Sequence, residues 1–189
     1  MGVAPRLAML IGLVVAACGE SGKTDLPDAS PDSGGDSGVD CSNGPLEAPI
    51  ANCAPVLAPS SGDPGQDCVN RINQLRARCQ CLPPLTRWTD GEACADVQAE
   101  YDVTHGAHGG FNGNICVPSG MAQNECPGWA SLGAVLGSCL QTMWDEGPGE
   151  DFQQHGHYRN MSSADFTKVA CGFFTTSEGV VWAVQNFSD

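Results

Sequence analysis

The sequence predicts a layered α+β domain in which helices pack against an antiparallel sheet. Three segments between residues 67 and 144 repeat apolar residues at helical spacing. Two later segments, "KVACGFF" (168–174) and "GVVWAVQNF" (179–187), are rich in β-branched and aromatic residues and flank the polar turn "TTSE". Because their apolar character is nearly continuous, we expect paired strands that are buried on both faces. Helices followed by a C-terminal hairpin are typical of an α+β domain.

The first 17 residues are predicted to form an export signal. Arg6 precedes an apolar run over residues 7–15, which is too short to span a bilayer and is followed by small residues. The stretch "VAAC" resembles a bacterial lipobox, which implies cleavage before Cys18 and acylation of that residue. Several acyl chains on one residue anchor a protein stably. A plain signal peptide with an incidental cysteine is the alternative.

The cysteine content agrees with export. The chain has 11 cysteines, and acylation of Cys18 would leave an even set. Exported thiols oxidise, so we expect five disulfides, whose pairing cannot be read from spacing. A structural zinc site at "CQC" is disfavoured because no second close pair stands at ligand spacing. The cysteines expected to pair are Cys41, Cys53, Cys68, Cys79, Cys81, Cys94, Cys116, Cys126, Cys139 and Cys171.

Residues 18–66 are predicted to be the lipidated cysteine followed by an acidic, disordered tether. The segment after Cys18 is rich in Asp, Ser, Gly and Pro and poor in large apolar residues, so it cannot bury enough surface to fold. Cys41 and Cys53 are expected to attach its last part to the body or to each other. We therefore expect an exported lipoprotein of the bacterial envelope, with the outer membrane or the cell surface as candidate locations.

The charge of the chain excludes one class of partner. The formal net charge is −14, and both the tether and the body, residues 67–189, are acidic. Binding of nucleic-acid phosphates needs a basic surface, so we expect no nucleic-acid partner. Cationic or neutral partners are easier to attract than anionic ones.

Three helices are expected in the body. The first spans residues 67–79 with Asp67 as a possible N-cap, the second residues 89–105 and the third residues 131–144. Their apolar faces are interpreted as core. These faces contain Cys68, Ile72, Leu75 and Cys79; Cys94, Val97 and Tyr101; and Leu132, Val135, Leu136, Cys139, Leu140 and Met143.

Several motifs resemble those of one known family. "GHYRNM" (156–161), followed by "VACGFF" and "VVWAVQNF", is similar to the C-terminal signature of the CAP superfamily (cysteine-rich secretory proteins, antigen 5 and plant pathogenesis-related 1 proteins). In that family the signature is typically G-H-Y-T-Q-M, then V-G-C-G, then an aromatic-ended strand. "MWDE", the loop "HGAHGGF" and "LTRWTDGEACADVQAEY" extend the resemblance over about residues 67–189. The resemblance implies a three-layer α-β-α sandwich with a central antiparallel sheet.

Members of this family hold two His and two Glu in a cleft, and the resemblance assigns them residue by residue. His157 matches the histidine of G-H-Y, and Glu146 matches the acid after the Trp. His108, with His105 as the alternative, matches the histidine of the central loop. The fourth residue is normally the Glu of a G-E-N motif. The corresponding stretch, residues 118–129, offers Gly120, Met121 or Gln123, and Glu125 is a further candidate to reach the cleft.

These residue types suit metal chemistry. Two imidazoles and one carboxylate are a common catalytic zinc set, so His108, His157 and Glu146 are candidate ligands for Zn²⁺ or another divalent cation. No cofactor is required. Without metal, a histidine beside a carboxylate can act as a general base. His155 would share a face with His157 on a strand, and we interpret it as a surface bystander.

The sequence favours a non-enzymatic binding module at the cell envelope. The resemblance implies a lipid or sterol, a metal ion or a protein as the ligand class. No nucleophile motif such as G-x-S-x-G is present, and whether the chain is an enzyme stays open. The enzymatic alternative is a metal-dependent hydrolase or protease that uses His108, Glu146 and His157. A structural envelope protein with a vestigial cleft is the third interpretation.

Overall fold

The computed structural model describes residues 40–189, so the predicted signal peptide, Cys18 and the first part of the tether lie outside it. Within residues 40–189, no helix has both the length and the apolar character that crossing a bilayer requires. The elements are α1 (Pro64–Gln80), β1 (Thr86–Arg87), α2 (Thr89–His105), α3 (Gly109–Asn112), β2 (Ala122–Trp129), α4 (Leu132–Ala134), the π-helical turn η1 (Val135–Cys139), α5 (Leu140–Asp145), α6 (Phe152–Ser162), β3 (Lys168–Thr175) and β4 (Val181–Ser188).

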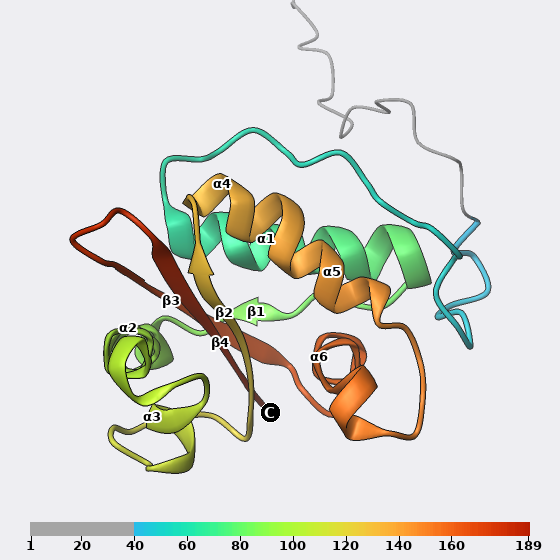
Figure 1. Cartoon of the computed structure of the whole chain (residues 1–189). Coiled ribbons are helices and arrows are strands. Elements are labelled where there is room, and N and C mark those ends of the chain that lie inside the picture. The colour runs from blue at the N-terminus through green and yellow to red at the C-terminus, as the bar shows by residue number, and fades with distance from the viewer. Residues whose placement is uncertain (1–39) are drawn as a thin grey trace, which may run out of the picture. The chain divides into compact units, whose positions relative to one another are not determined.

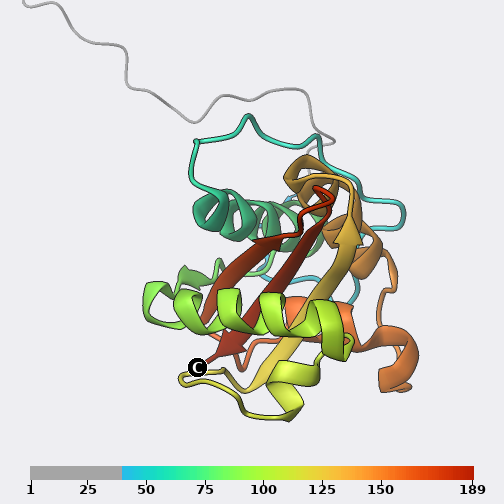
Figure 2. The same ribbon diagram turned by 60° about the vertical axis from the view of Figure 1, so that its left-hand side comes forward.

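Helices cover both faces of a four-stranded sheet with the order β1-β3-β4-β2 (Figure 1). β4 pairs antiparallel with β3 and with β2, while the short β1 runs parallel to β3. Figure 2 shows α2 crossing in front of the sheet and α1 behind it. This arrangement is the predicted three-layer α-β-α sandwich, and the predicted C-terminal hairpin is confirmed.

The first helix starts earlier than predicted. α1 begins at Pro64, and the side chain of Asp63 accepts a hydrogen bond from a backbone N–H of the first turn. A capping Asp followed by Pro is a common helix start. Asp67, which we predicted as the N-cap, instead lies inside the helix and accepts hydrogen bonds from Ser60 Oγ and the Ser61 N–H.

Residues 40–63, which we assigned to the disordered tether, form a strap along α1. The backbone N–H groups of Leu46 and Ile50 donate to the carbonyls of Gln80 and Cys79 at the end of that helix. Two disulfides also attach the strap, one to Cys79 of α1 and one to Cys81 directly after that helix. The prediction of disorder was wrong for this segment, whereas the expectation that Cys41 and Cys53 attach it to the body is confirmed. Such covalent attachment offsets the entropy cost of ordering a polar chain.

Every cysteine in the described part of the chain is in a disulfide. Cys68–Cys171 joins α1 to β3 across 103 residues of sequence. Small disulfide-dense domains are typical of oxidising compartments, so the five bonds fit an extracellular protein. The pairs are Cys41–Cys81, Cys53–Cys79, Cys68–Cys171, Cys94–Cys116 and Cys126–Cys139.

The main core lies between the sheet and the helices α1, α5 and α6. The predicted apolar face of residues 67–79 is buried. Residues 131–144, predicted as one helix, form the consecutive helical elements α4, η1 and α5, and their predicted stripe is buried except for a partly exposed Leu132. Core packing is therefore confirmed for both predicted faces.

The other face of the sheet has a thinner layer. α2 has the predicted bounds, but Val97 is 47% exposed and does not belong to the core. The helix instead turns Ala95 and Ala99 toward Val184 of β4. Gly172 of β3 allows this close approach, because a Cβ there would overlap the backbone of Ala95. Of the predicted face, Cys94 is buried, but the sequence pattern missed the other buried residues of α2 because they are small or polar.

Candidate functional site

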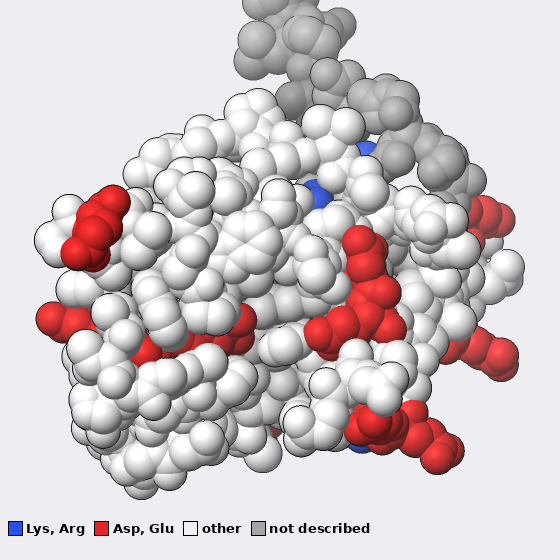
Figure 3. Space-filling view, in the orientation of Figure 1, with Lys and Arg blue, Asp and Glu red and all other residues white. Residues whose placement is uncertain are grey.

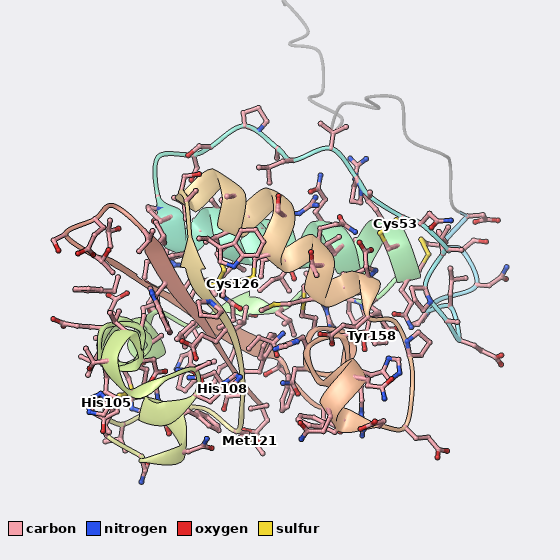
Figure 4. The ribbon with its side chains drawn as sticks, viewed as in Figure 1. Cys53, His105, His108, Met121, Cys126 and Tyr158 are labelled. Carbon is pink, nitrogen blue, oxygen red and sulfur yellow. A yellow bond between two sulfur atoms is a disulfide. The ribbon has the colours of Figure 1, made fainter. Side chains whose placement is uncertain are left out.

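A cleft of about 190 Å³ opens between α6, the start of β2 and the α2–α3 loop. The rings of His108 and His157 lie across from each other in it, with centroids 6.4 Å apart and planes inclined by 26°. Figure 4 shows His108 on the side of the α2–α3 segment that faces the sheet, and His105 on its outer side. The full lining is His108, Gln123, Phe152, Gln153, Gly156, His157 and Asn160.

Glu146 orients His157. His157 lies on α6, and its Nδ1 is 2.5 Å from Glu146 Oε1. The other carboxylate oxygen, Glu146 Oε2, accepts from the backbone N–H groups of His157 and Tyr158. Because the carboxylate is an acceptor, Nδ1 of the neutral ring carries the hydrogen and Nε2 keeps a lone pair. Glu146, predicted as a metal ligand, therefore stands behind the ring and positions it.

Gln123 orients His108 in the same way. Gln123 Oε1 lies 2.8 Å from His108 Nδ1, while Gln123 Nε2 donates to Gln98 Oε1 and Asn186 Oδ1. These two acceptors fix which end of the amide faces the ring, so Nδ1 of His108 donates and Nε2 is again left with a lone pair. Gln98 and Asn186 were not identified from the sequence, since they lie on α2 and β4 and carry no motif.

Gln123 is the residue at the fourth position of the site. Met121 is 63% exposed, and Gly120 packs against the backbone of Phe187, so neither of the other two positions offered by the sequence contacts His108. A neutral amide thus replaces the carboxylate that the G-E-N motif would supply. Of the two glutamates expected in this cleft, the one at this position is therefore absent.

Glu125 does not line the cleft. Its side chain has no exposed surface, and its Oε2 accepts a hydrogen bond from the backbone N–H of His108. Asp102 on α2 accepts in turn from the N–H of Gly110. The two carboxylates hold the turn that presents His108, whose φ of 63° lies in the left-handed region that few side chains adopt. The role expected for Glu125 is corrected from cleft residue to support of the loop.

Glu125 and Asp102 are two buried carboxyl groups that lie beside each other, which affects the charge of Glu125. Burial, opposed by the His108 N–H and reinforced by Asp102, raises the pKa of Glu125 to about 8. Within residues 40–189, Glu125 Oε1 and Asp102 Oδ2 have no donor of their own. A proton on Glu125 supplies one, because the protonated carboxyl can donate to Asp102. The pair is thus most stable with one shared proton.

The stability of the domain should fall as pH rises from about 4.5 to 8. The pKa of Glu125 is 4.5 when unperturbed and about 8 when folded, so the folded state binds the extra proton and loses that advantage as pH rises through 8. Glu125→Gln should flatten this fall, measured as melting temperature against pH. Some slope will remain, because burial also raises the pKa of Asp96. Glu178→Gln in the exposed β3–β4 turn is the control, and an equal effect there would contradict the assignment.

The other two histidines lie outside the cleft. The ring of His105 stacks on Tyr101 at 3.6 Å, and its Nδ1 contacts the Tyr101 carbonyl. His155 donates from Nδ1 to the carbonyls of Glu146 and Gly147, which fixes the loop before α6. His155 and His157 stand on a helix and not on a strand, so residues two apart do not share a face.

The cleft offers two metal donors. In the described part of the chain, no three His, Cys, Asp or Glu side chains come together at metal-binding geometry. The Nε2 atoms of His108 and His157 suit zinc, which takes imidazole nitrogen at about 2.0–2.1 Å, but two further positions would need water or an external donor. The donor set therefore fits a divalent ion as a half-site.

The fold and the two-histidine cleft define a CAP-like domain. Residues 69–187 match the model of the CAP family, described as the cysteine-rich secretory protein family, and the chain belongs to this family. Among solved structures, BmVAL-1 has a similar fold, with a TM-score of 0.50, 18% sequence identity, and coverage of 66% of this chain and 76% of that chain. No curated protein matches the sequence at a significant level.

Proposed function

We propose that this chain is an exported, non-enzymatic binding module whose cleft holds a divalent cation between His108 and His157. The observation that carries the proposal is that each Nδ1 is held by an acceptor, Gln123 Oε1 for one ring and Glu146 Oε1 for the other. Each Nε2 then keeps its lone pair, and such a nitrogen is a common metal ligand. A bound ion would take its remaining donors from water or from the ligand.

The lining of the cleft favours a protein ligand over a lipid or sterol. Its walls carry amide side chains, from Gln123, Gln153 and Asn160, beside the two histidines, and Phe152 is the one large apolar side chain. A volume of about 190 Å³ is small for a site that encloses a sterol-sized molecule, since pockets of that kind usually hold about 300–1,000 Å³. A carboxylate or carbonyl from a protein surface would complete the coordination of the ion.

Hydrolysis is the second candidate, and the hydrogen bonds of the cleft weigh against Glu146 as its general base. Both oxygens of Glu146 accept hydrogen bonds from α6, so Nε2 of His157 is the group left to take a proton from water, and it is the same atom that would bind the metal ion. All cysteines of residues 40–189 are in disulfides, which removes thiol nucleophiles from that range. Turnover of an ester or peptide that chelators abolish would favour the hydrolase instead.

Calorimetric titration of the metal-stripped full chain with Zn²⁺ tests the proposal. We expect one-to-one binding in the native chain and a loss of about a hundredfold or more in His157→Ala, because each zinc ligand contributes several kcal/mol. His105→Ala is the matched control, since that exposed histidine lies outside the cleft and should leave the titration unchanged. Absence of binding in the native chain would contradict the metal site.

Export and anchoring form a separate part of the proposal, supported by the "VAAC" stretch at residues 15–18. We expect the native chain to fractionate with membranes and the Cys18→Ala variant to appear in the soluble fraction, because the acyl chains would supply the membrane affinity. Fractionation followed by immunoblotting measures this. Membrane association that survives the substitution would remove the lipid anchor from the proposal.

A further inference from the structure

A second and larger cavity, of about 510 Å³, lies between the strap and the C-terminal end of α5. Residues 48–54 form one wall, and residues 144–148 contribute the other. Its volume is within the range of small-molecule sites, about 300–1,000 Å³. The strap precedes residues 69–187, the part that matches the family. This cavity is therefore built partly by a segment outside the common CAP domain.

The wall of this cavity combines apolar and polar groups. Its apolar part comes from Ile50 and Ala51 of the strap and from Trp144 and Pro148. Trp144 is 2% exposed and belongs to the main core, so the cavity borders the packed interior at this residue.

Two bonds fix the strap in this shape. Cys53 is joined to Cys79 of α1, and the carbonyl of Cys53 accepts a hydrogen bond from Gln141 on α5. A covalent bond and a hydrogen bond thus fix the strap to the two helices beside it. A preformed cavity binds with a smaller ordering cost than one that must close around its ligand.

Asp145 places a negative charge at the edge of the apolar wall. It is exposed, and its Oδ1 accepts from Gln141, while residues 40–189 supply no hydrogen bond to Oδ2. Arg71, a cation that acts electrostatically on Asp145, is only 4% exposed and is engaged with Pro55 and Gln141. Figure 3 shows acidic side chains over the end of α5 and few basic ones on this face. The field at the cavity therefore favours a cation.

We propose that the cavity between the strap and α5 is a binding site for a small amphiphilic amine. The apolar part of the ligand packs against Ile50, Trp144 and Pro148, and its ammonium group pairs with Asp145. This site is separate from the His108–His157 cleft and does not depend on zinc.

Three probes with the same eight-carbon chain test the proposal: octylammonium, octanol and octanoate, each below its micelle concentration. Calorimetry on the full native chain should show one-to-one binding of octylammonium at least about tenfold tighter than binding of octanoate, with octanol between them. Asp145→Asn should bring the three affinities close together, since it removes the charge and keeps the apolar wall.

A filling substitution locates the site. Ala51→Trp should abolish binding of all three probes, whereas Val97→Trp, on the exposed side of α2, should leave binding unchanged. Melting curves establish that each variant is folded, and Asp145→Asn stands alone as the test if the filled variant is not. The proposal is overturned if no probe binds, if octanoate binds as tightly as octylammonium, or if folded Ala51→Trp retains binding.

Discussion

Gly172→Ala should destabilise the domain by about 3 kcal/mol, the upper end of the usual cost of overpacking. A Cβ at Gly172 would overlap the backbone of Ala95 and Asp96 on α2. The helix cannot simply move away, because Asp96 Oδ1 accepts a 2.7 Å hydrogen bond from the N–H of Phe173. Denaturant unfolding with the disulfides intact measures the change.

Gly137→Ala is the matched control for this prediction. Gly137 lies inside the helical segment of η1, where a Cβ would meet Leu57 Cδ2 at an ordinary 3.7 Å. Replacing a helical Gly by Ala stabilises by up to about 1 kcal/mol when the space is free. The two substitutions should therefore act in opposite directions. A cost below about 1 kcal/mol at Gly172 would mean that α2 does not depend on this contact.

The parts of the fold that the sequence predicted are those with a strong apolar signal, which is periodic in the helices and nearly continuous in the strands. Residues 89–105 form a helix with the expected bounds, and the hairpin of β3 and β4 lies where the apolar runs are. β2 was missed because Gln123, Asn124 and Glu125 are polar yet buried, so the strand gives no hydrophobic signal. Side chains from other elements satisfy these polar groups, and no local pattern records that.

The sequence likewise predicted only part of the candidate site. His157 and Glu146 could be assigned from motifs, and the resemblance narrowed the loop histidine to His108 with His105 as the alternative. The partner of His108 could not, since Gln123 is held by Gln98 and Asn186, which are 25 and 63 residues away in sequence. The replacement of an acid by an amide at this point becomes visible only when the three side chains are seen together.

Gln123→Glu should raise the affinity of the cleft for Zn²⁺ by about tenfold, because outer partners of a histidine ligand change metal affinity by about 10–100-fold. A carboxylate accepting from His108 Nδ1 makes Nε2 a stronger donor. The same change should lower the free energy of unfolding by about 1–3 kcal/mol, since Gln98 Oε1 and Asn186 Oδ1 lose the hydrogen bonds from Gln123 Nε2. Zinc titration and metal-free unfolding measure the two effects.

Glu146→Gln makes the opposite substitution in the same cleft, because it replaces a carboxylate by an amide. His157 then faces a neutral acceptor as His108 does now, and zinc affinity should fall by about 10–100-fold. The amide keeps the size of the side chain, so a loss of affinity does not report a cavity. Its NH2 group replaces Oε2, which accepts from the N–H groups of His157 and Tyr158, so metal-free unfolding is measured beside the zinc titration. If neither exchange alters zinc affinity, the Nδ1 partners do not tune the site, whereas opposite shifts would mean that Gln123 sets this cleft to bind its ion weakly. A weak half-site suits an ion that is shared with a ligand, because the ligand's own donor then decides whether the ion is held.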